Sequence, residues 1–253
     1  MDLGLKGKKA IVVGGARGIG YAIAETLARE GADVAVTARN GDSVKDAVAN
    51  LKKYETKVIG SASDVTDGDK FTDWMKETDE ALGGCDILVP ISSAGGGMGS
   101  LKYWDRAFNV DVMGPVRAVD AVIEGMTERG GGSIVLIGTT SVREAMGGPQ
   151  AYNAMKASLV TWGKQLALHH GKDGIRCNVV SPGPVEFEGG NWEMLKGAME
   201  KFYNAMIKQH PQGRFGNPEE IARCVAFLAS PAASWVNGSH LVVDGGFTNA
   251  THF

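Results

Sequence analysis

The stretch AIVVGGARGIG at residues 10–20 decides the fold of this chain, because it joins a strand signal directly to a helix signal. Its first four residues form a short apolar run rich in β-branched side chains, which is typical of a buried strand. Glycines follow and permit a tight turn before an amphipathic pattern that runs from Tyr21 to Glu30 and closes on Gly31. The stretch therefore predicts a strand, a glycine-rich turn and a helix in immediate succession.

The same alternation continues along all 253 residues. Apolar runs predict further strands at residues 33–37, 57–62, 86–90, 133–138, 175–180 and 240–243. Helical patterns occupy residues 42–53, 67–82, 103–129 and 150–170, and another helix begins at Pro218. The strand runs are nearly continuously apolar, as in parallel strands covered on both faces. We therefore expect an α/β fold, a single doubly wound (Rossmann) domain over residues 1–253 with about seven parallel strands and helices on both faces of the sheet.

Residues 184–215 interrupt this rhythm with a long insertion rich in aromatic and methionine side chains. An insertion of this length inside a compact domain is usually a functional lid or a disordered stretch. Its apolar content, which includes Trp192, Phe202 and Met206, favours ordered packing. The sequence therefore predicts a lid. It leaves two roles for these side chains equally open, a wall of a substrate site or packing in the core or against another subunit.

The composition excludes several function classes. Hydrophobic residues make up 43% and charged residues 22%, and a formal net charge of -3 gives no electrostatic reason to expect nucleic acid or an anionic membrane as a partner. Cys85, Cys177 and Cys224 are odd in number and lack CxxC spacing, which argues against disulfides and a metal site. The first residues lack a signal-peptide core, and no apolar run reaches the roughly 18–20 residues of a membrane span. A cytoplasmic protein is expected.

The glycine-rich turn indicates a site for a dinucleotide. Gly14, Gly18 and Gly20 follow the pattern GxxxGxG, in which backbone N–H groups can approach a pyrophosphate at a helix N-terminus. A purely structural turn is the alternative. The second strand is followed by Arg39, and Arg17 lies in the glycine-rich turn, so two guanidinium groups are available to a 2′-phosphate. The pair predicts NADP(H) rather than NAD(H), unless Arg39 is only a solvated surface residue.

The strongest chemical signal is the sequence YNAMK at residues 152–156. Positions four apart share a face of a helix, so the phenol of Tyr152 and the ammonium of Lys156 project together. A free tyrosine has a pKa of about 10, and a neighbouring cation lowers that pKa toward the range in which a phenol exchanges protons. Such pairs are common on helix surfaces, but this one follows a buried strand at the edge where parallel sheets form ligand crevices. The sequence therefore predicts a proton-transferring pair.

Together these motifs resemble the short-chain dehydrogenase/reductase family over nearly the whole chain. The matching pieces are GGARGIG at 14–20, Asp64-Val65, Ala94-Gly95, Asn109 in FNVDV, YNAMK at 152–156, Ser181-Pro182-Gly183, GRFGNPEEIA at 213–222 and VDGG at 243–246. Within the family, the chain is most similar to the 3-oxoacyl-carrier-protein-reductase and hydroxysteroid-dehydrogenase-like group. The resemblance implies an oxidoreductase that moves a hydride between NADP(H) and a carbonyl or alcohol carbon.

The resemblance also implies roles at the matching positions. Tyr152 would exchange a proton with the substrate oxygen, Lys156 would lower the phenol's pKa and bind the nicotinamide ribose, and Asn109 would anchor a water that leads protons to Lys156. The helix that carries Asn109 is expected to kink, because Pro115 cannot donate a backbone hydrogen bond. The implied cofactor-binding residues are Gly14, Arg17, Gly18, Ile19, Gly20, Arg39, Asp64, Val65, Ser93, Ala94, Gly95, Tyr152, Lys156, Pro182, Gly183 and Val185.

Two departures from the family pattern alter the expected site. Ser92 and Ser93 stand where the family usually has two asparagines, so contacts with the ribose are expected to differ. Thr139 stands where the family has its catalytic serine. A threonine hydroxyl donates the same hydrogen bond, while its methyl group narrows the site. We expect Thr139 to be that donor, with Ser141 as the alternative.

The lid predicts an apolar small molecule as the substrate. A 3-oxoacyl chain on an acidic carrier protein is the alternative, although lysines that could contact such a carrier are sparse in the lid. A non-catalytic NADP(H)-binding sensor on the same fold, and an epimerase or dehydratase with tightly held NAD, are rival functions. The family is commonly tetrameric, so the resemblance implies a homotetramer or a homodimer.

Overall fold

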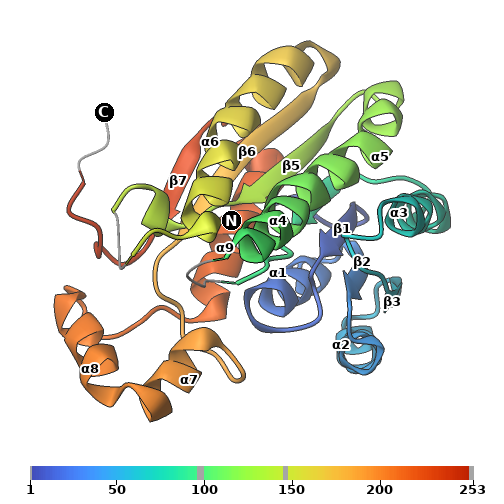
Figure 1. The fold of residues 1–253 in the computed structure, drawn as a ribbon. Coiled ribbons are helices and arrows are strands. Elements are labelled where there is room, and N and C mark those ends of the chain that lie inside the picture. The colour runs from blue at the N-terminus through green and yellow to red at the C-terminus, as the bar shows by residue number, and fades with distance from the viewer. Residues whose placement is uncertain (1, 96–99, 145–147, 251–253) are drawn as a thin grey trace.

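One parallel sheet organises the chain. The computed structural model describes residues 2–95, 100–144 and 148–250. Within this part of the chain, seven strands lie in the order β3-β2-β1-β4-β5-β6-β7 (Figure 1). The strands are β1 (Lys9–Val13), β2 (Asp33–Ala38), β3 (Val58–Ala62), β4 (Ile87–Pro90), β5 (Gly132–Ile137), β6 (Ile175–Pro182) and β7 (His240–Val243). Each lies within two residues of its predicted bounds, and the predicted α/β fold class is confirmed.

Helices cover both faces of this sheet (Figure 1). The helices on one face are α1 (Gly18–Arg29), α2 (Gly41–Leu51) and α9 (Pro218–Ala229), and those on the other are α3 (Gly68–Leu82), α5 (Gly114–Glu128) and α6 (Ala151–His170). Ile23 and Val225 are fully buried in the first layer, and Phe71 and Val122 in the second. Short 3₁₀ turns occupy Lys52–Tyr54, Thr140–Val142, Gly171–Asp173 and Pro231–Ala233. No helix in the described part of the chain is both long and apolar enough to cross a membrane.

The helix predicted over residues 103–129 is interrupted. It consists of α4 (Leu101–Ala107), a π-helical segment η2 (Phe108–Met113) and α5. Pro115 lies in the first turn of α5, where a missing N–H is tolerated, so the interruption falls next to the proline that predicted it. A π segment adds a residue to the turn and is frequent at functional sites. Here it carries the side chain of Asp111 into the interior, where it is 0% exposed.

The expectation that every strand is covered on both faces is wrong at the sheet edge. The central strands β1, β4 and β5 are buried over nearly their whole length. Gly60, Ser61 and Ala62 at the end of β3 are exposed. Because β3 has a neighbouring strand on one side only, its apolar sequence does not imply complete burial.

The lid predicted at residues 184–215 is ordered. It contains α7 (Asn191–Ala198) and α8 (Glu200–Gln209), which lie together at one end of the sheet (Figure 1). Aromatic rings hold it together, since Phe215 packs against Trp192 and Tyr203 with ring centroids 4.6 and 5.1 Å away. Tyr203 and Phe215 are buried. Internal packing is therefore one role of the lid's aromatic residues.

The two ends of the lid meet in a short parallel bridge, which we call the neck (residues 184–186 and Gly216). The Gly216 N–H donates to the Pro184 carbonyl at 3.0 Å, and the Glu186 N–H donates to the Gly216 carbonyl at 3.0 Å. Beyond the neck, Asn217 caps α9 by accepting a hydrogen bond from the N–H of Glu220 at 3.0 Å. The neck and this cap fix where the lid leaves β6 and where it joins α9.

Candidate functional site

The carboxyl ends of the central strands open into a cavity of about 1230 Å³. The turn after β1, the ends of β2, β4, β5 and β6, the start of α6 and the lid form its walls. Predicted site residues that line it are Gly14, Arg17, Ile19, Gly20, Arg39, Asp64, Val65, Ser93, Gly95, Thr139, Ser141, Tyr152, Lys156, Pro182, Gly183 and Val185. The cavity lies where the strand order reverses between β1 and β4, which is where open parallel sheets bind ligands.

The turn after β1 leaves room for atoms of a ligand at the start of α1. Gly14 has a φ of 95°, and a side-chain carbon at Gly20 would lie 2.1 Å from the Gly14 carbonyl oxygen, so neither position accepts a larger residue. The Gly14 N–H donates to the carbonyl of Thr37 at 2.8 Å, which fixes the turn to β2. Helix α1 has no side-chain N-cap and no acidic residue in its first turn. Its N-terminal N–H groups therefore fit an anionic group such as a pyrophosphate.

The far end of the cavity has a cationic and hydroxylic rim. Arg17 and Arg39 are exposed there, and Asn40 and Ser43 line the same wall. The side chain of Asn40 caps α2 by accepting from the Ser43 N–H at 3.0 Å. Sequence reasoning missed Asn40 and Ser43. An asparagine just before the helix that follows β2 is a helix-cap signal, and it could have identified both residues.

Gly18 does not line the cavity, although it belongs to the predicted glycine pattern. A side-chain carbon at Gly18 would lie 2.5 Å from the ring of Phe187, which comes from the start of the lid. Gly18 is therefore needed because the lid packs on the turn, and not because its own backbone borders the cavity. Nothing in the local sequence indicates this contact.

Tyr152 and Lys156 lie on one face of α6, as predicted. The Lys156 Nζ is 6.0 Å from the centre of the Tyr152 ring. Tyr152 is half-buried at the cavity wall, whereas Lys156 is only 2% exposed. The hydroxyl of Thr139 forms a hydrogen bond with the Tyr152 hydroxyl, and it also accepts from the Ser141 N–H at 3.3 Å. Of the two candidate hydroxyl groups, that of Thr139 therefore contacts the phenol.

Asn109 is not part of this cluster, and the prediction that placed it there needs correction. Its amide donates to the carbonyl of Asp105 at 2.9 Å, one turn back on the same helix. The residue that approaches Lys156 is Asp111, with its Oδ1 at 3.4 Å from the Lys156 Nζ. The Oδ2 of Asp111 accepts from the N–H of Ala94 at 3.1 Å, which explains why Ala94 matters although it does not line the cavity. The signal that was missed is the single acid Asp111 between Val110 and Val112. An acid in such an apolar segment is buried with it and then needs a charged or hydrogen-bonding partner.

Burial and charge set the acidity of this cluster. Burial, reinforced by the charge of Asp111, raises the pKa of Tyr152 to about 12, and the hydrogen bond with Thr139 opposes this rise. Burial also lowers the pKa of Lys156, and the nearby carboxylate of Asp111 opposes that change. The carboxylate therefore favours the protonated forms of both the phenol and the amine.

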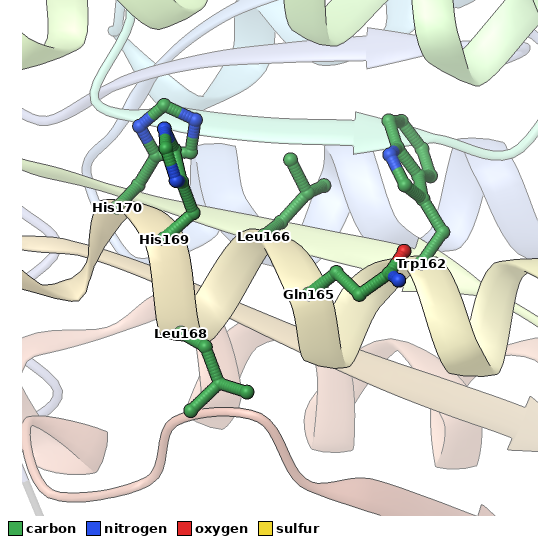
Figure 2. Close-up of a pocket in the computed structure, with 6 residues that line it drawn as sticks. All are labelled: Trp162, Gln165, Leu166, Leu168, His169 and His170. Carbon is green, nitrogen blue, oxygen red and sulfur yellow. The ribbon is translucent and has the colours of Figure 1, made fainter.

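A second, shallow hollow lies on the C-terminal half of α6 (Figure 2). Figure 2 shows Trp162, Leu166 and His170 on one side of the helix and Leu168 on the opposite side. Leu168 is 73% exposed. No group of three or more His, Cys, Asp or Glu side chains that could hold a metal ion occurs among the described residues. The hollow combines the apolar side chains of Trp162, Leu166 and Leu168 with the polar side chains of Gln165, His169 and His170.

The chain is similar over its whole length to proteins of one family. A family model described as enoyl-(acyl carrier protein) reductase matches residues 14–248. Isoepoxydon dehydrogenase of Penicillium expansum is 33% identical, covering 100% of this chain and 99% of that protein. D-threitol dehydrogenase of Mycolicibacterium smegmatis is 36% identical, covering 98% and 95%. The crystal structure of L-sorbose reductase from Gluconobacter frateurii, complexed with NADPH and L-sorbose, has a TM-score of 0.91 at 33% identity and covers 99% of this chain and 100% of that one.

Replacement of Lys156 by methionine tests the buried ion pair directly. Lys156→Met leaves the Asp111 carboxylate without a counter-charge inside the protein. Removing one partner of a buried pair costs about 3–5 kcal/mol, and we expect the free energy of unfolding at neutral pH to fall by about this amount. Urea unfolding followed by circular dichroism measures it. Lys102→Met, at an exposed position of α4, is the control. Equal losses of stability in the two variants would contradict the pairing.

Proposed function

The chain belongs to the short-chain dehydrogenase/reductase family, and we propose that it transfers a hydride between NADP(H) and a carbonyl or secondary alcohol with Tyr152 as general acid and base. Family membership makes the protein an oxidoreductase that acts on alcohol or carbonyl substrates. The observation that carries the proposal is the cluster at the cavity wall, in which Tyr152 is hydrogen-bonded to the hydroxyl of Thr139 and has the Lys156 Nζ 6.0 Å from the centre of its ring.

The cluster supports a concerted proton transfer. In the reductive direction, the substrate carbonyl oxygen accepts hydrogen bonds from Thr139 and Tyr152, and Tyr152 gives up its proton as negative charge develops on that oxygen. Each such donor stabilises the transition state by about 2.7–4 kcal/mol in enzymes where one was removed. A nicotinamide cofactor bound in the cavity supplies the hydride. In the oxidative direction, Tyr152 accepts the alcohol proton, and the charge of Lys156 stabilises the phenolate.

The cavity supports NADP(H) as that cofactor. The uncapped N-terminus of α1 would hold the pyrophosphate, and the side chains of Arg17, Arg39 and Ser43 would hold the 2′-phosphate. L-sorbose reductase, whose structure contains NADPH, gives independent support. The residues that would contact the adenine, the ribose and the nicotinamide are Asp64, Val65, Ser93, Gly95, Lys156, Pro182, Gly183 and Val185.

We propose a free small molecule as the substrate. The lid contributes Trp192, Leu195 and Met206 to the cavity, which supports an apolar surface on the substrate. Gln150 and Asn153 line the cavity at the start of α6, so two amides are available for a polar group on the same molecule. Relatives named for small molecules, such as D-threitol dehydrogenase, support this choice. The description of the family model keeps reduction of a carrier-protein-bound chain as the second candidate.

We also propose that the chain forms a homotetramer or homodimer through α4 and α6. Leu101 on α4 is 83% exposed, and Leu168 on α6 is 73% exposed. The opposite face of α6 is already buried against the sheet, as Leu159 shows. A helix with apolar residues on all sides is normally buried. A second copy of this chain would cover the outer face.

The three cysteines support a cytoplasmic location. All of them are free, and Cys85 and Cys177 are buried. Burial raises the pKa of both thiols, that of Cys177 to about 12, so neither readily forms a thiolate. Free, unreactive thiols are typical of proteins in reducing compartments.

Tyr152→Phe tests the proposed function. It removes the proton donor and keeps the ring, so kcat/KM for NADPH-dependent reduction of a carbonyl should fall at least about 100-fold. The absorbance of NADPH follows the reaction with a panel of ketones. Tyr54→Phe is the control, because the Tyr54 hydroxyl bonds Glu25 at 3.0 Å and does not line the cavity. Undiminished turnover in Tyr152→Phe would refute the assignment. If the unmodified protein binds NADPH but none of the ketones in the panel causes its oxidation, a non-catalytic NADP(H)-binding sensor is favoured.

Arg39→Glu tests the cofactor preference. It replaces a cation at the cavity rim by an anion that repels a 2′-phosphate. Because hydrogen bonds to charged groups contribute about 1.5–3 kcal/mol, the Kd for NADPH should rise about tenfold or more while that for NADH stays similar. Fluorescence titration with each cofactor measures both constants. Lys52→Glu, an exposed charge reversal after α2, should change neither. Equal changes for the two cofactors would argue against a 2′-phosphate at Arg39.

Leu168→Glu tests the subunit contact. A charge on the outer face of α6 should dissociate the assembly to a smaller species, which analytical ultracentrifugation resolves. Ala49→Glu places the same charge on the exposed face of α2 and should leave the mass unchanged. If Leu168→Glu keeps the mass of the unmodified protein, α6 is not the contact.

A further inference from the structure

Asp111 occupies an unusual position for a carboxylate. It lies in the π segment η2, is 0% exposed and does not line the cavity. Its Oδ2 accepts the Ala94 N–H at 3.1 Å, while its Oδ1 has no hydrogen-bond partner among the described residues and lies 3.4 Å from the Lys156 Nζ. A buried carboxylate without solvent depends on a nearby cation. Lys156 is that cation.

The groups that face Asp111 form a small closed set in the described part of the chain. Tyr152 and Lys156 come from α6, and Tyr103 comes from α4, with Arg106 of the same helix acting on Tyr103. The Tyr103 hydroxyl donates to the carbonyl of Gly95. Lys156 is the fully buried cation of this set. Its ammonium lies much nearer to the Asp111 carboxylate, at 3.4 Å, than to the centre of the Tyr152 ring, at 6.0 Å.

The net charge of this cluster decides how easily Tyr152 ionises. With an uncharged side chain at position 111, the cluster would carry one positive charge while Tyr152 is protonated, and loss of the phenolic proton would neutralise it. With the Asp111 carboxylate, the cluster is already neutral, and loss of the same proton leaves a net negative charge on a largely buried cluster. An uncompensated charge in a low-dielectric interior is costly. Tyr152 therefore holds its proton more firmly when position 111 carries the carboxylate.

We propose that Asp111 is a positioning residue of the proton-transferring cluster, which keeps Lys156 charged and in place and makes Tyr152 hold its proton to higher pH. The proposal rests on the proposed function in one respect, the role of Tyr152 as the acid and base. Its consequence is that protonated Tyr152, the form that reduces a carbonyl, persists across the neutral range. The oxidative reaction, which needs the phenolate, becomes favourable only as pH rises.

Asp111→Asn tests this with a side chain of the same shape and no charge. The amide oxygen can still accept the Ala94 N–H, so the loop contact survives. Ionisation of Tyr152 in the purified full-length protein is read from the ultraviolet absorbance of tyrosinate. Subtracting the same titration of the Tyr152→Phe counterpart isolates the one phenol. Circular dichroism defines the pH range in which each protein stays folded. The readout needs neither cofactor nor substrate.

We expect the midpoint for Tyr152 to be lower in Asp111→Asn by about 1–3 pH units, the range typical of one neighbouring charge. The proposal is equally supported if Tyr152 ionises within the folded pH range in Asp111→Asn but not in the unmodified protein. Asp111→Glu should keep the midpoint of the unmodified protein, because it keeps the charge. Asp105→Asn removes an exposed carboxylate from α4 and should also keep it. If Asp111→Asn does not fold, Asp111→Ser carries the same expectation with a smaller uncharged side chain.

An unchanged or higher midpoint in Asp111→Asn would overturn the proposal, and so would a failure of Tyr152 to ionise within the folded pH range in both proteins. An equal shift in Asp105→Asn would do so too, since it would make the effect one of net charge alone. The proposed function fails separately. If Tyr152→Phe keeps full turnover, Tyr152 is not the acid and base whatever its titration. If turnover requires Tyr152 but Asp111→Asn leaves the midpoint in place, only the role of Asp111 is lost.

Discussion

The reversal of strand order between β1 and β4 is the constraint from which the site follows. To one side of β1 the chain builds β2 and β3, and to the other it builds β4 to β7, so the loops after β1 and β4 diverge and leave a crevice. The two loops touch at its floor, where a side-chain carbon at Gly14 would lie 2.9 Å from the Ser92 nitrogen. All strands are parallel, so every carboxyl end delivers its loop to the same edge. Residues that follow β1, β2, β4, β5 and β6 thus meet at that edge, and the lid after β6 adds a further wall.

Within this geometry, burial controls the charges of Tyr152, Lys156 and Asp111. Tyr152 and Lys156 both border the cavity, although Lys156 is only 2% exposed, while Asp111 lies behind them and is 0% exposed. The lysine is held by a carboxylate that comes from a π segment, and the same carboxylate fixes the Ala94 loop after β4. One interior side chain therefore ties the loop of the central strand to the helix that carries the phenol. The position of Tyr152 is therefore set by the core as much as by α6.

Much of this could be predicted from the sequence, and the failures have physical causes. Apolar runs located the strands, and the four-residue spacing of Tyr152 and Lys156 located the pair, because both signals are local. Burial of β3 was overestimated, since an apolar run does not say whether a strand lies at an edge. Asn109 was predicted and Asp111 was missed because a motif match gives residue types without the phase of the helix, and a π turn changes that phase. The contact of Phe187 with Gly18 depends on the path of the lid and has no local signal.

The neck gives the lid an independence that the rest of the chain does not have. Pro184 and Gly216 are hydrogen-bonded to each other, so the chain returns to the point from which it left. Residues added or lost between α7 and α8 alter the closed loop at a small entropic cost and leave β6 and α9 where they are. The lid can therefore vary in length and sequence without a change in the rest of the fold. Changes in the lid would alter which molecules fit beneath it and would leave the cluster of Tyr152, Lys156 and Asp111 in place.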